Sequence, residues 1–208
     1  MGEQVAEAVE GGADYLHVDV MDGRFVPPIS FGAQMVEAIK RHAGQVPLDV
    51  HLMIHEPINL VSDFLDAGSD LLVVHAEACH NLQETILAVR DRGGKVGVAL
   101  KPDSPIELLL PVLADLDLAL VMSVNPGYAA QKYIPSVETK VTALREIIDE
   151  GGLPTELEVD GGINEETAPR AAAAGASLLV AGSAVYGRTE PVSARIETIR
   201  LAARSGLV

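Results

Sequence analysis

Short apolar segments alternate with helical patterns along the whole chain, and this alternation constrains the fold most strongly. Helical spacing of apolar residues, with capping residues at the ends, predicts eight helices, at residues 2–10, 33–41, 57–67, 81–91, 106–113, 136–150, 165–174 and 192–205. The apolar segments between them predict seven strands, at residues 15–20, 48–53, 71–75, 95–100, 118–123, 156–160 and 178–181. Strict alternation requires right-handed crossovers between parallel strands, so the chain is expected to be an α/β protein.

A repeated phrase marks the end of several predicted helices. It reads Gly-Gly-Ala-Asp at 11–14, Ala-Gly-Ser-Asp at 67–70 and Ala-Gly-Ala-Ser at 174–177. Glycine is the residue expected just after a helix ends, because it adopts the left-handed conformation without strain. Each phrase therefore predicts a short turn from a helix into the next strand.

The order and number of the elements favour a (β/α)8 TIM barrel over an open sheet. The chain begins on a helix and has one strand fewer than it has helices, so we expect such a barrel from which strand 1 is missing. The alternative is a seven-stranded doubly wound sheet, but its strands would be apolar on both faces. We find no linker or boundary, so residues 1–208 are expected to form a single domain.

Three of the predicted strands carry polar residues on one face only. Because side chains two apart in a strand share a face, Tyr15, His17, Asp19 and Met21 lie on one side of the first strand. The same alternation places Asp49, His51 and Met53 together, and Glu158 with Asp160. Barrel active sites lie at the C-terminal ends of the strands, where most of these residues fall.

His17, Asp19, His51 and Asp160 form a plausible nitrogen and oxygen ligand set for a divalent transition ion such as Zn²⁺. The alternative is that these residues are structural or solvated. Met21, Met53 and Met122 also fall at strand ends, either as flexible core residues or as an apolar lining around a reactive carbon.

Glycine-rich loops follow three of the last strands: Asn125-Pro126-Gly127-Tyr128, Gly161-Gly162 and Ala181-Gly182-Ser183. Glycine lets the backbone approach a ligand closely, and helix N-termini attract anions. Each glycine alone is consistent with ordinary turn chemistry, but their succession after neighbouring strands favours a phosphate site.

Composition excludes several classes of partner. The net charge of −15 argues against nucleic acid and anionic membranes. The single cysteine permits neither an intrachain disulfide nor a multi-cysteine zinc site. No apolar stretch reaches the roughly 18 residues of a membrane span, and the N-terminus lacks a signal-peptide pattern, so a cytoplasmic protein is expected.

Five segments together resemble the ribulose-phosphate 3-epimerase family, in order and over nearly the whole chain. They are His-Val-Asp-Val-Met-Asp-Gly (17–23), Asp-Val-His-Leu-Met (49–53), Val-Met-Ser-Val-Asn-Pro-Gly (121–127), Glu-Val-Asp-Gly-Gly-Ile (158–163) and Val-Ala-Gly-Ser-Ala (180–184). The resemblance implies a ribulose-phosphate-binding barrel that interconverts D-ribulose 5-phosphate and D-xylulose 5-phosphate in the pentose phosphate pathway. It also implies a homo-oligomer.

The resemblance further implies a role for each site residue. One divalent metal ion (Zn, Fe, Mn or Co) would be bound by His17, Asp19, His51 and Asp160, and the two aspartates would be the acid/base pair. The sugar phosphate would be held by His51, Gly127, Tyr128, Ala129, Ala130, Gly161, Gly162, Gly182 and Ser183. Two carboxylates suit this reaction, because one removes the proton next to the ketone and the other returns a proton to the opposite face.

Two departures from the family pattern leave alternatives open. The family's first strand, with its serine, has no counterpart before Gly2, which suggests a truncated or misassigned start. The family's Pro-Gly-Phe-Gly-Gly-Gln loop reads Pro-Gly-Tyr-Ala-Ala-Gln at 126–131, so phosphate binding is expected to be weaker. The alternatives are an epimerase of a related ketose phosphate such as allulose 6-phosphate, a decarboxylase or lyase using Lys101, and an inactive paralogue.

Overall fold

The structure is a computed structural model that describes residues 2–128, 130–186 and 189–207. The chain divides into two compact units, Met1–Ala99 and Leu100–Val208. In each unit, parallel strands alternate with helices, as the sequence predicts.

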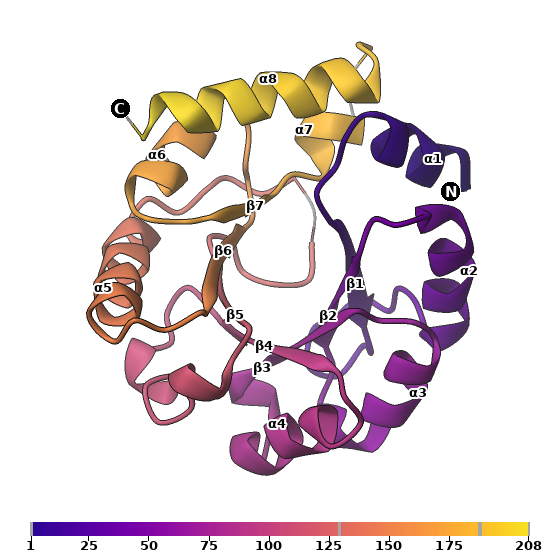
Figure 1. Ribbon diagram of the computed structural model, residues 1–208, viewed down its shortest axis with the longest axis vertical. Helices are drawn as coiled ribbons and strands as arrows, with labels where there is room; N and C mark the ends of the chain where they lie inside the picture. The colour runs from indigo at the N-terminus through magenta and orange to yellow at the C-terminus, as the bar shows by residue number, and fades with distance from the viewer. Residues whose placement is uncertain (1, 129, 187–188, 208) are drawn as a thin grey trace. The chain divides into compact units, whose positions relative to one another are not determined.

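The first unit contains four parallel strands that neighbour one another in sequence order, β1-β2-β3-β4. Its elements are α1 (Gly2–Glu10), β1 (Leu16–Met21), α2 (Ala33–Ala43), β2 (Leu48–Met53), η1 (Pro57–Leu60), α3 (Val61–Asp66), β3 (Leu71–His75), η2 (Ala76–Ala78), α4 (Leu82–Arg90) and β4 (Lys95–Leu100). The η elements are short 3₁₀ turns. Helices α2, α3 and α4 lie along the same side of these strands (Figure 1).

The second unit contains three parallel strands, again neighbouring in sequence order, β5-β6-β7. Its elements are η3 (Ile106–Leu108), η4 (Leu113–Asp115), β5 (Leu118–Met122), α5 (Val137–Glu150), β6 (Glu156–Asp160), α6 (Ala168–Ala173), β7 (Leu178–Val180), α7 (Ser183–Tyr186) and α8 (Val192–Ser205). Helix α8 packs beside α6 and α7 (Figure 1). In neither unit does the strand order reverse, whereas a doubly wound sheet reverses its order at a switch point.

Burial follows a two-residue period in β1, whereas β2 is buried on both faces. In β1, Leu16, Val18 and Val20 are buried, whereas the alternate residues that begin with His17 are only half-buried. All six residues of β2 are buried, including Asp49. Such strands need helices on one face and a second packed layer on the other, which explains an aliphatic composition with few aromatic residues.

The repeated helix-ending phrase forms the same turn three times. Gly12, Gly68 and Gly175 have positive φ angles of 81°, 99° and 110°. In each turn the following amide donates to the carbonyl five residues earlier; for example, the amide of Ser69 donates to the carbonyl of Phe64 at 3.2 Å. This is the Schellman motif, which satisfies the last carbonyls of the helix and confirms the predicted caps.

Three helix predictions need correction. In place of the predicted α-helix at 106–113 the structure has two short 3₁₀ turns, Ile106–Leu108 and Leu113–Asp115, because Pro111 lacks an amide hydrogen and its ring would clash with a preceding carbonyl. The predicted helix at 165–174 is shorter, with Pro169 in its first turn. Helix α7 was not predicted, so the eight α-helices of the described residues agree with the predicted number but not with every predicted position.

Among the residues that the structure describes, no helix has both the length and the apolar character needed to cross a membrane.

Candidate metal centre and phosphate loops

The pairing of β1 with β2 brings three of the predicted ligands together. The strands are parallel and in register, so that His17 lies opposite Asp49 and Asp19 lies opposite His51. These four residues belong to the same two-residue period on each strand, so their side chains share one face. The site in the first unit therefore depends on the strand register and not on loop geometry.

One ring nitrogen of His17 and one of His51 lie close to the same carboxylate oxygen of Asp19. Oδ1 of Asp19 lies 3.3 Å from Nε2 of His17 and 3.0 Å from Nδ1 of His51. A tetrahedral zinc site with bonds of about 2.05 Å has edges of about 3.3 Å between its ligand atoms. Two imidazole nitrogens and one carboxylate oxygen at this spacing fit a divalent transition ion, with room for further ligands.

A buried carboxylate lies behind His17. Asp49 is 1% exposed, and its Oδ2 accepts a hydrogen bond from Nδ1 of His17 at 2.5 Å. Burial by itself lowers the pKa of His17, but the charge of Asp49 and hydrogen bonds to Asp19 and Asp49 outweigh it, and the pKa is raised well above its ordinary value. Asp49 thus orients the ring so that Nε2 points toward Asp19.

Asp19 is held in its ionised form by the two rings beside it. Its partial burial by itself raises the pKa, but hydrogen bonds and charges from His17 and His51 lower the pKa far below its ordinary value. The side chain is still 40% exposed, so the carboxylate can be reached from solution. An ionised, accessible carboxylate between two imidazoles can bind a cation or accept a proton.

His51 has a second imidazole behind it. His75, the last residue of β3, places its Nε2 3.0 Å from Nε2 of His51, and its Nδ1 lies 3.1 Å from Oε2 of Glu77. Neither histidine side chain is exposed. From the sequence, His75 could only be placed at a strand end, and Glu77 carried no signal because it follows the strand in a short turn.

Asp22 connects the loops that follow β1 and β2. Its Oδ1 accepts from the amides of Arg24 and Phe25, both at 2.8 Å, and its Oδ2 accepts from the amide of His55 at 2.8 Å. Burial by itself raises the pKa of Asp22, but these three hydrogen bonds outweigh it and lower the pKa. The aspartate following β1 therefore has a structural role that the sequence did not reveal.

Replacing Asp22 by alanine should lower the free energy of unfolding by about 1 kcal/mol, because three amides lose their acceptor. Since the folded-state pKa is lowered, the stabilisation is present above the ordinary aspartate pKa and disappears as the pH falls through the lowered value. Urea denaturation across this acidic range measures the difference. Glu10→Ala, which removes an exposed carboxylate from α1, is the control, and an equal loss in both variants would contradict the assigned role.

Asp160 lies in the second unit, as the last residue of β6. It pairs with Met122 of β5 on one side and with Val180 of β7 on the other. Its carbonyl accepts from the amide of Ser123 at 2.7 Å, and the hydroxyl of Ser123 donates to the carbonyl of Gly161 at 2.6 Å. These bonds fix the backbone at the point where the Asp160 side chain leaves the strand.

Two glycines after Asp160 let the loops that follow β5 and β6 touch. Gly161 and Gly162 have φ angles of 124° and 64°. A methyl group on Gly161 would come within 2.9 Å of the amide nitrogen of Val124, and one on Gly162 within 2.7 Å of that of Tyr133. No other residue fits either position without displacing backbone, which explains the Asp-Gly-Gly phrase.

The loop after β5 carries a strained alanine. Ala130 has a φ of 57°, a left-handed conformation that strains any residue with a Cβ atom, and the family phrase has glycine at this position. Gly127, in the same loop, has a φ of 119°. The Gln131 side chain holds the loop by donating to the carbonyls of Asn125 and Tyr128, at 2.6 and 2.8 Å. The predicted residue Ala129 lies outside the described residues.

Changing Ala130 to glycine should raise the free energy of unfolding by about 0.5–1 kcal/mol, because it removes the strain of a left-handed alanine. Ala143→Gly, in the middle of α5, is the matched control and should lower it by about 1 kcal/mol. Thermal denaturation of both variants provides the measurement. Destabilisation of both by a similar amount would show that the positive φ carries no strain.

The third predicted loop leads into the short helix α7. Gly182 precedes it, and Ser183 is its first residue. The guanidinium of Arg195, from α8, donates through Nε to the carbonyl of Ala184 at 2.9 Å and forms an ion pair with Glu165, which precedes α6. Arg195 is only 7% exposed. Arg195 therefore connects α7 to the loop after β6. The sequence did not predict this role, because Arg195 lies in an amphipathic helix.

The three predicted lining methionines lie at strand ends. Met21 and Met53 are opposite each other in the β1–β2 pair, and Met122 is the last residue of β5. Met53 and Met122 are 1% and 2% exposed, whereas Met21 is half-buried.

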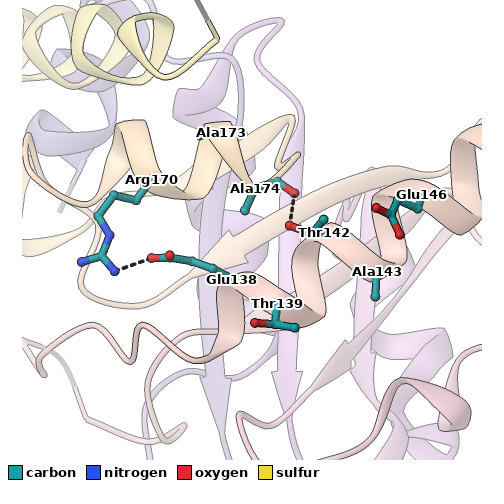
Figure 2. Close-up of a pocket in the computed structure, with 8 residues that line it drawn as sticks. All are labelled: Glu138, Thr139, Thr142, Ala143, Glu146, Arg170, Ala173 and Ala174. Atoms are coloured by element: carbon teal, nitrogen blue, oxygen red, sulfur yellow. Dashed lines mark hydrogen bonds and ion pairs between the residues drawn. The ribbon is translucent and has the colours of Figure 1, made fainter.

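A separate groove of about 700 Å³ lies between α5 and α6. Figure 2 shows that an ion pair between Glu138 and Arg170, at 2.8 Å, crosses it, and that the Thr142 hydroxyl donates to the carbonyl of Ala174. The groove contains no histidine and none of the predicted site residues. Its chemistry therefore does not match the predicted active site.

Comparison with known proteins agrees with the fold and with the resemblance. The chain is 50% identical over 191 residues to ribulose-phosphate 3-epimerase of Bacillus subtilis, covering 91% of this chain and 88% of that protein. It is 47% identical over 188 residues to the Synechocystis protein of the same name, covering 89% and 81%.

A solved structure, 3-hexulose-6-phosphate synthase from Salmonella typhimurium, superimposes with a TM-score of 0.70 at 17% identity, covering 92% of this chain and 99% of that one. At this identity the likeness concerns the fold alone, and it confirms the (β/α)-barrel class with seven parallel strands in the described residues. The Ribulose-phosphate 3 epimerase family matches residues 1–186. The chain therefore belongs to the ribulose-phosphate 3-epimerase family.

Proposed function

We propose that this enzyme interconverts D-ribulose 5-phosphate and D-xylulose 5-phosphate by moving a proton at C3, with the help of one divalent metal ion. The observation that carries the proposal is the convergence of His17, Asp19 and His51 on one face of the paired strands β1 and β2. Family membership supplies the substrate class. A single barrel domain, assembled into a homo-oligomer, is part of the same proposal.

Asp160 completes the proposed ligand set. It enters from the likeness of residues 158–163 to the family phrase and from its position at the end of β6. Two imidazole nitrogens and two carboxylate oxygens form a donor set suited to zinc, iron, manganese or cobalt. When bound, such an ion would supply Lewis-acid stabilisation of the negative charge that develops on the substrate oxygens.

Asp19 and Asp160 are the proposed acid/base pair. Epimerisation requires one carboxylate to take the C3 proton and the other to deliver a proton to the opposite face. The two histidines keep Asp19 deprotonated, which is the form that a general base and a metal ligand both require. Each carboxylate can exchange its proton with water between turnovers. The proton that is returned to C3 can therefore come from solvent.

Backbone amides of the glycine loops are the proposed phosphate ligands. The proposed segments are Gly127–Ala130, Gly161–Gly162 and Gly182–Ser183. Gly161 and Gly162 let the loop after β6 lie against the loop after β5, to which Gly127 and Ala130 belong, and α7 presents its first amides directly after Gly182. Backbone groups suit this protein because its net charge of −15 repels an anionic substrate over the rest of its surface.

The methionines would line the reacting carbon. Met21, Met53 and Met122 present weakly polar, flexible side chains that can exclude water without competing for protons. Exclusion of water strengthens every electrostatic interaction in the site.

Incubation with ribulose 5-phosphate in D₂O tests the proposal, with Zn²⁺, Mn²⁺, Fe²⁺ or Co²⁺ supplied in turn. Deuterium should appear at C3 of the sugar together with xylulose 5-phosphate, as followed by NMR. Treatment with a chelator should stop the exchange, and restoring the ion should recover it. No exchange with any of these ions would contradict the proposed activity and favour an inactive paralogue.

A further inference from the structure

We propose that His75 and Glu77 are positioning residues that fix the tautomer of His51, so that the lone pair of its Nδ1 points toward the metal site. This inference rests on the proposed metal-dependent function, and it adds two residues to the seven side chains proposed to bind metal or line the site. All of the contacts that support it lie within the first unit.

Four side chains form one chain of contacts that ends in a carboxylate on each side. Oδ1 of Asp19 lies 3.0 Å from Nδ1 of His51, Nε2 of His51 lies 3.0 Å from Nε2 of His75, and Nδ1 of His75 lies 3.1 Å from Oε2 of Glu77. Both histidine side chains are 0% exposed, whereas the Glu77 side chain is 17% exposed. Water is therefore kept from the two rings.

The positions of the protons on these four side chains can be assigned by starting at the carboxylate of Glu77. An ionised carboxylate only accepts hydrogen bonds, so Nδ1 of His75 must carry its proton toward Glu77. Burial disfavours a charged ring, so Nε2 of His75 has a lone pair and accepts from Nε2–H of His51. With its Nε2–H directed at His75, the His51 ring has Nδ1 as the nitrogen that can offer a lone pair, and a metal ion requires such a lone pair.

This assignment describes the metal-bound form: without the hydrogen that joins His51 to Asp19 in the metal-free site, two acceptors, Nδ1 of His51 and Oδ1 of Asp19, face each other across 3.0 Å. Such a contact is unfavourable by itself and becomes favourable when a cation shares both lone pairs. The opposite assignment would place the proton of His51 toward Asp19 and the lone pair of His75 toward Glu77. That arrangement would place two acceptors, Nδ1 of His75 and Oε2 of Glu77, against each other. It would also leave a proton on Nδ1 of His51, the nitrogen that is proposed to bind the metal.

The other imidazole ligand has a matching arrangement. His17 donates from Nδ1 to Asp49 at 2.5 Å, and its Nε2 points toward Asp19. Each ring therefore has its own carboxylate: Asp49 acts on His17 directly, and Glu77 acts on His51 through His75. Outer carboxylates of this kind orient the ligand ring and raise its basicity.

The first test is the tautomer of His75 and His51, read from two-bond ¹H–¹⁵N correlations of the histidine-labelled full chain with and without Zn²⁺. His75 should show the Nδ1–H tautomer, which is the less common one, and His51 should show Nε2–H with its Nδ1 signal shifted when zinc is bound. A His75 ring that is protonated on Nε2 would overturn the proposal without any substitution.

The second test is zinc affinity, measured by competition with a chromogenic chelator. Glu77→Leu removes the acceptor while keeping the side-chain size, and it should weaken zinc binding about 10- to 100-fold. Glu84→Leu, which removes an exposed carboxylate from α4, is the matched control and should leave the affinity unchanged. Equal affinities for the two variants would overturn the proposal.

These results separate the inference from the proposed function. If ribulose 5-phosphate shows no exchange but the tautomers and the loss of zinc affinity appear as expected, the positioning role stands and the activity is wrong. If exchange occurs but Glu77→Leu binds zinc as tightly as Glu84→Leu, only the positioning role is wrong.

Discussion

Replacing Asp160 by asparagine is expected to abolish deuterium exchange at C3 of ribulose 5-phosphate while leaving the fold intact. Asparagine keeps the size of the side chain but cannot take or deliver a proton at neutral pH. Loss of a general acid or base costs about 10²- to 10⁴-fold in rate, and the proposed second role of Asp160 as a metal ligand adds to that loss. The measurement is the initial rate of deuterium incorporation at saturating metal.

Glu166→Gln provides the control for this change. Glu166 is an exposed carboxylate in the loop that follows β6, so its replacement changes the charge near Asp160 without touching the strand. Circular dichroism and thermal denaturation should be alike in both variants. Exchange by Asp160→Asn at more than about a tenth of the normal rate would remove Asp160 from the chemistry, given the size of the effects expected.

Replacing His51 by alanine is expected to empty the metal site. The substitution removes one of two imidazole ligands, so the loss of affinity should exceed the about 10- to 100-fold that the loss of an outer partner costs. Elemental analysis after dialysis should find far less than one metal ion per chain, and exchange at C3 should be lost with it.

Two further variants keep this prediction falsifiable. The His51 side chain is fully buried, so alanine leaves a cavity, and His51→Gln tests the same ligand with less loss of volume. His80→Ala removes an exposed histidine from the same unit and should keep its metal. Full metal occupancy in both His51 variants would show that the ligand set is wrong.

The strands of this protein could be predicted from the sequence because each is a short apolar segment between helical patterns, and β1 and β2 also show a two-residue period. His17 and Asp19 showed their shared face by alternating with Val18 and Val20, and the burial in β1 follows the same alternation. The Schellman turns could be predicted from a glycine at the same place in three phrases.

The helices were harder to predict where proline or short length interfered. The run Leu108-Leu109-Leu110 has helical apolar content, but Pro111 prevents a continuous helix, so apolar content alone gave the wrong answer. Helix α7 has only four residues, which is too short for any periodic pattern. At α6, Pro169 indicated that the helix begins after residue 165, because proline is favoured in the first turn of a helix.

The candidate site could be predicted only in part, since residue spacing gives the face of a strand but not the contacts between strands. The pairing of Asp49 with His17 depends on the register of β1 and β2, and the contact between His51 and His75 depends on the packing of β2 and β3. The role of Asp22 depends on where the two loops run. These partners stabilise the predicted ligands, so they are found only when the strands are placed side by side.

The in-register pairing of β1 and β2 has a consequence for which sequence changes this chain can tolerate. Because the donors sit at every second position, deleting a single residue inside either strand would turn all the following donors to the opposite face. A conservative substitution of one donor residue weakens the candidate metal centre, whereas deletion of one residue within the strand removes several donors from the centre at once. The spacing of residues in these two segments is therefore under tighter constraint than the identity of most of the residues that fill them.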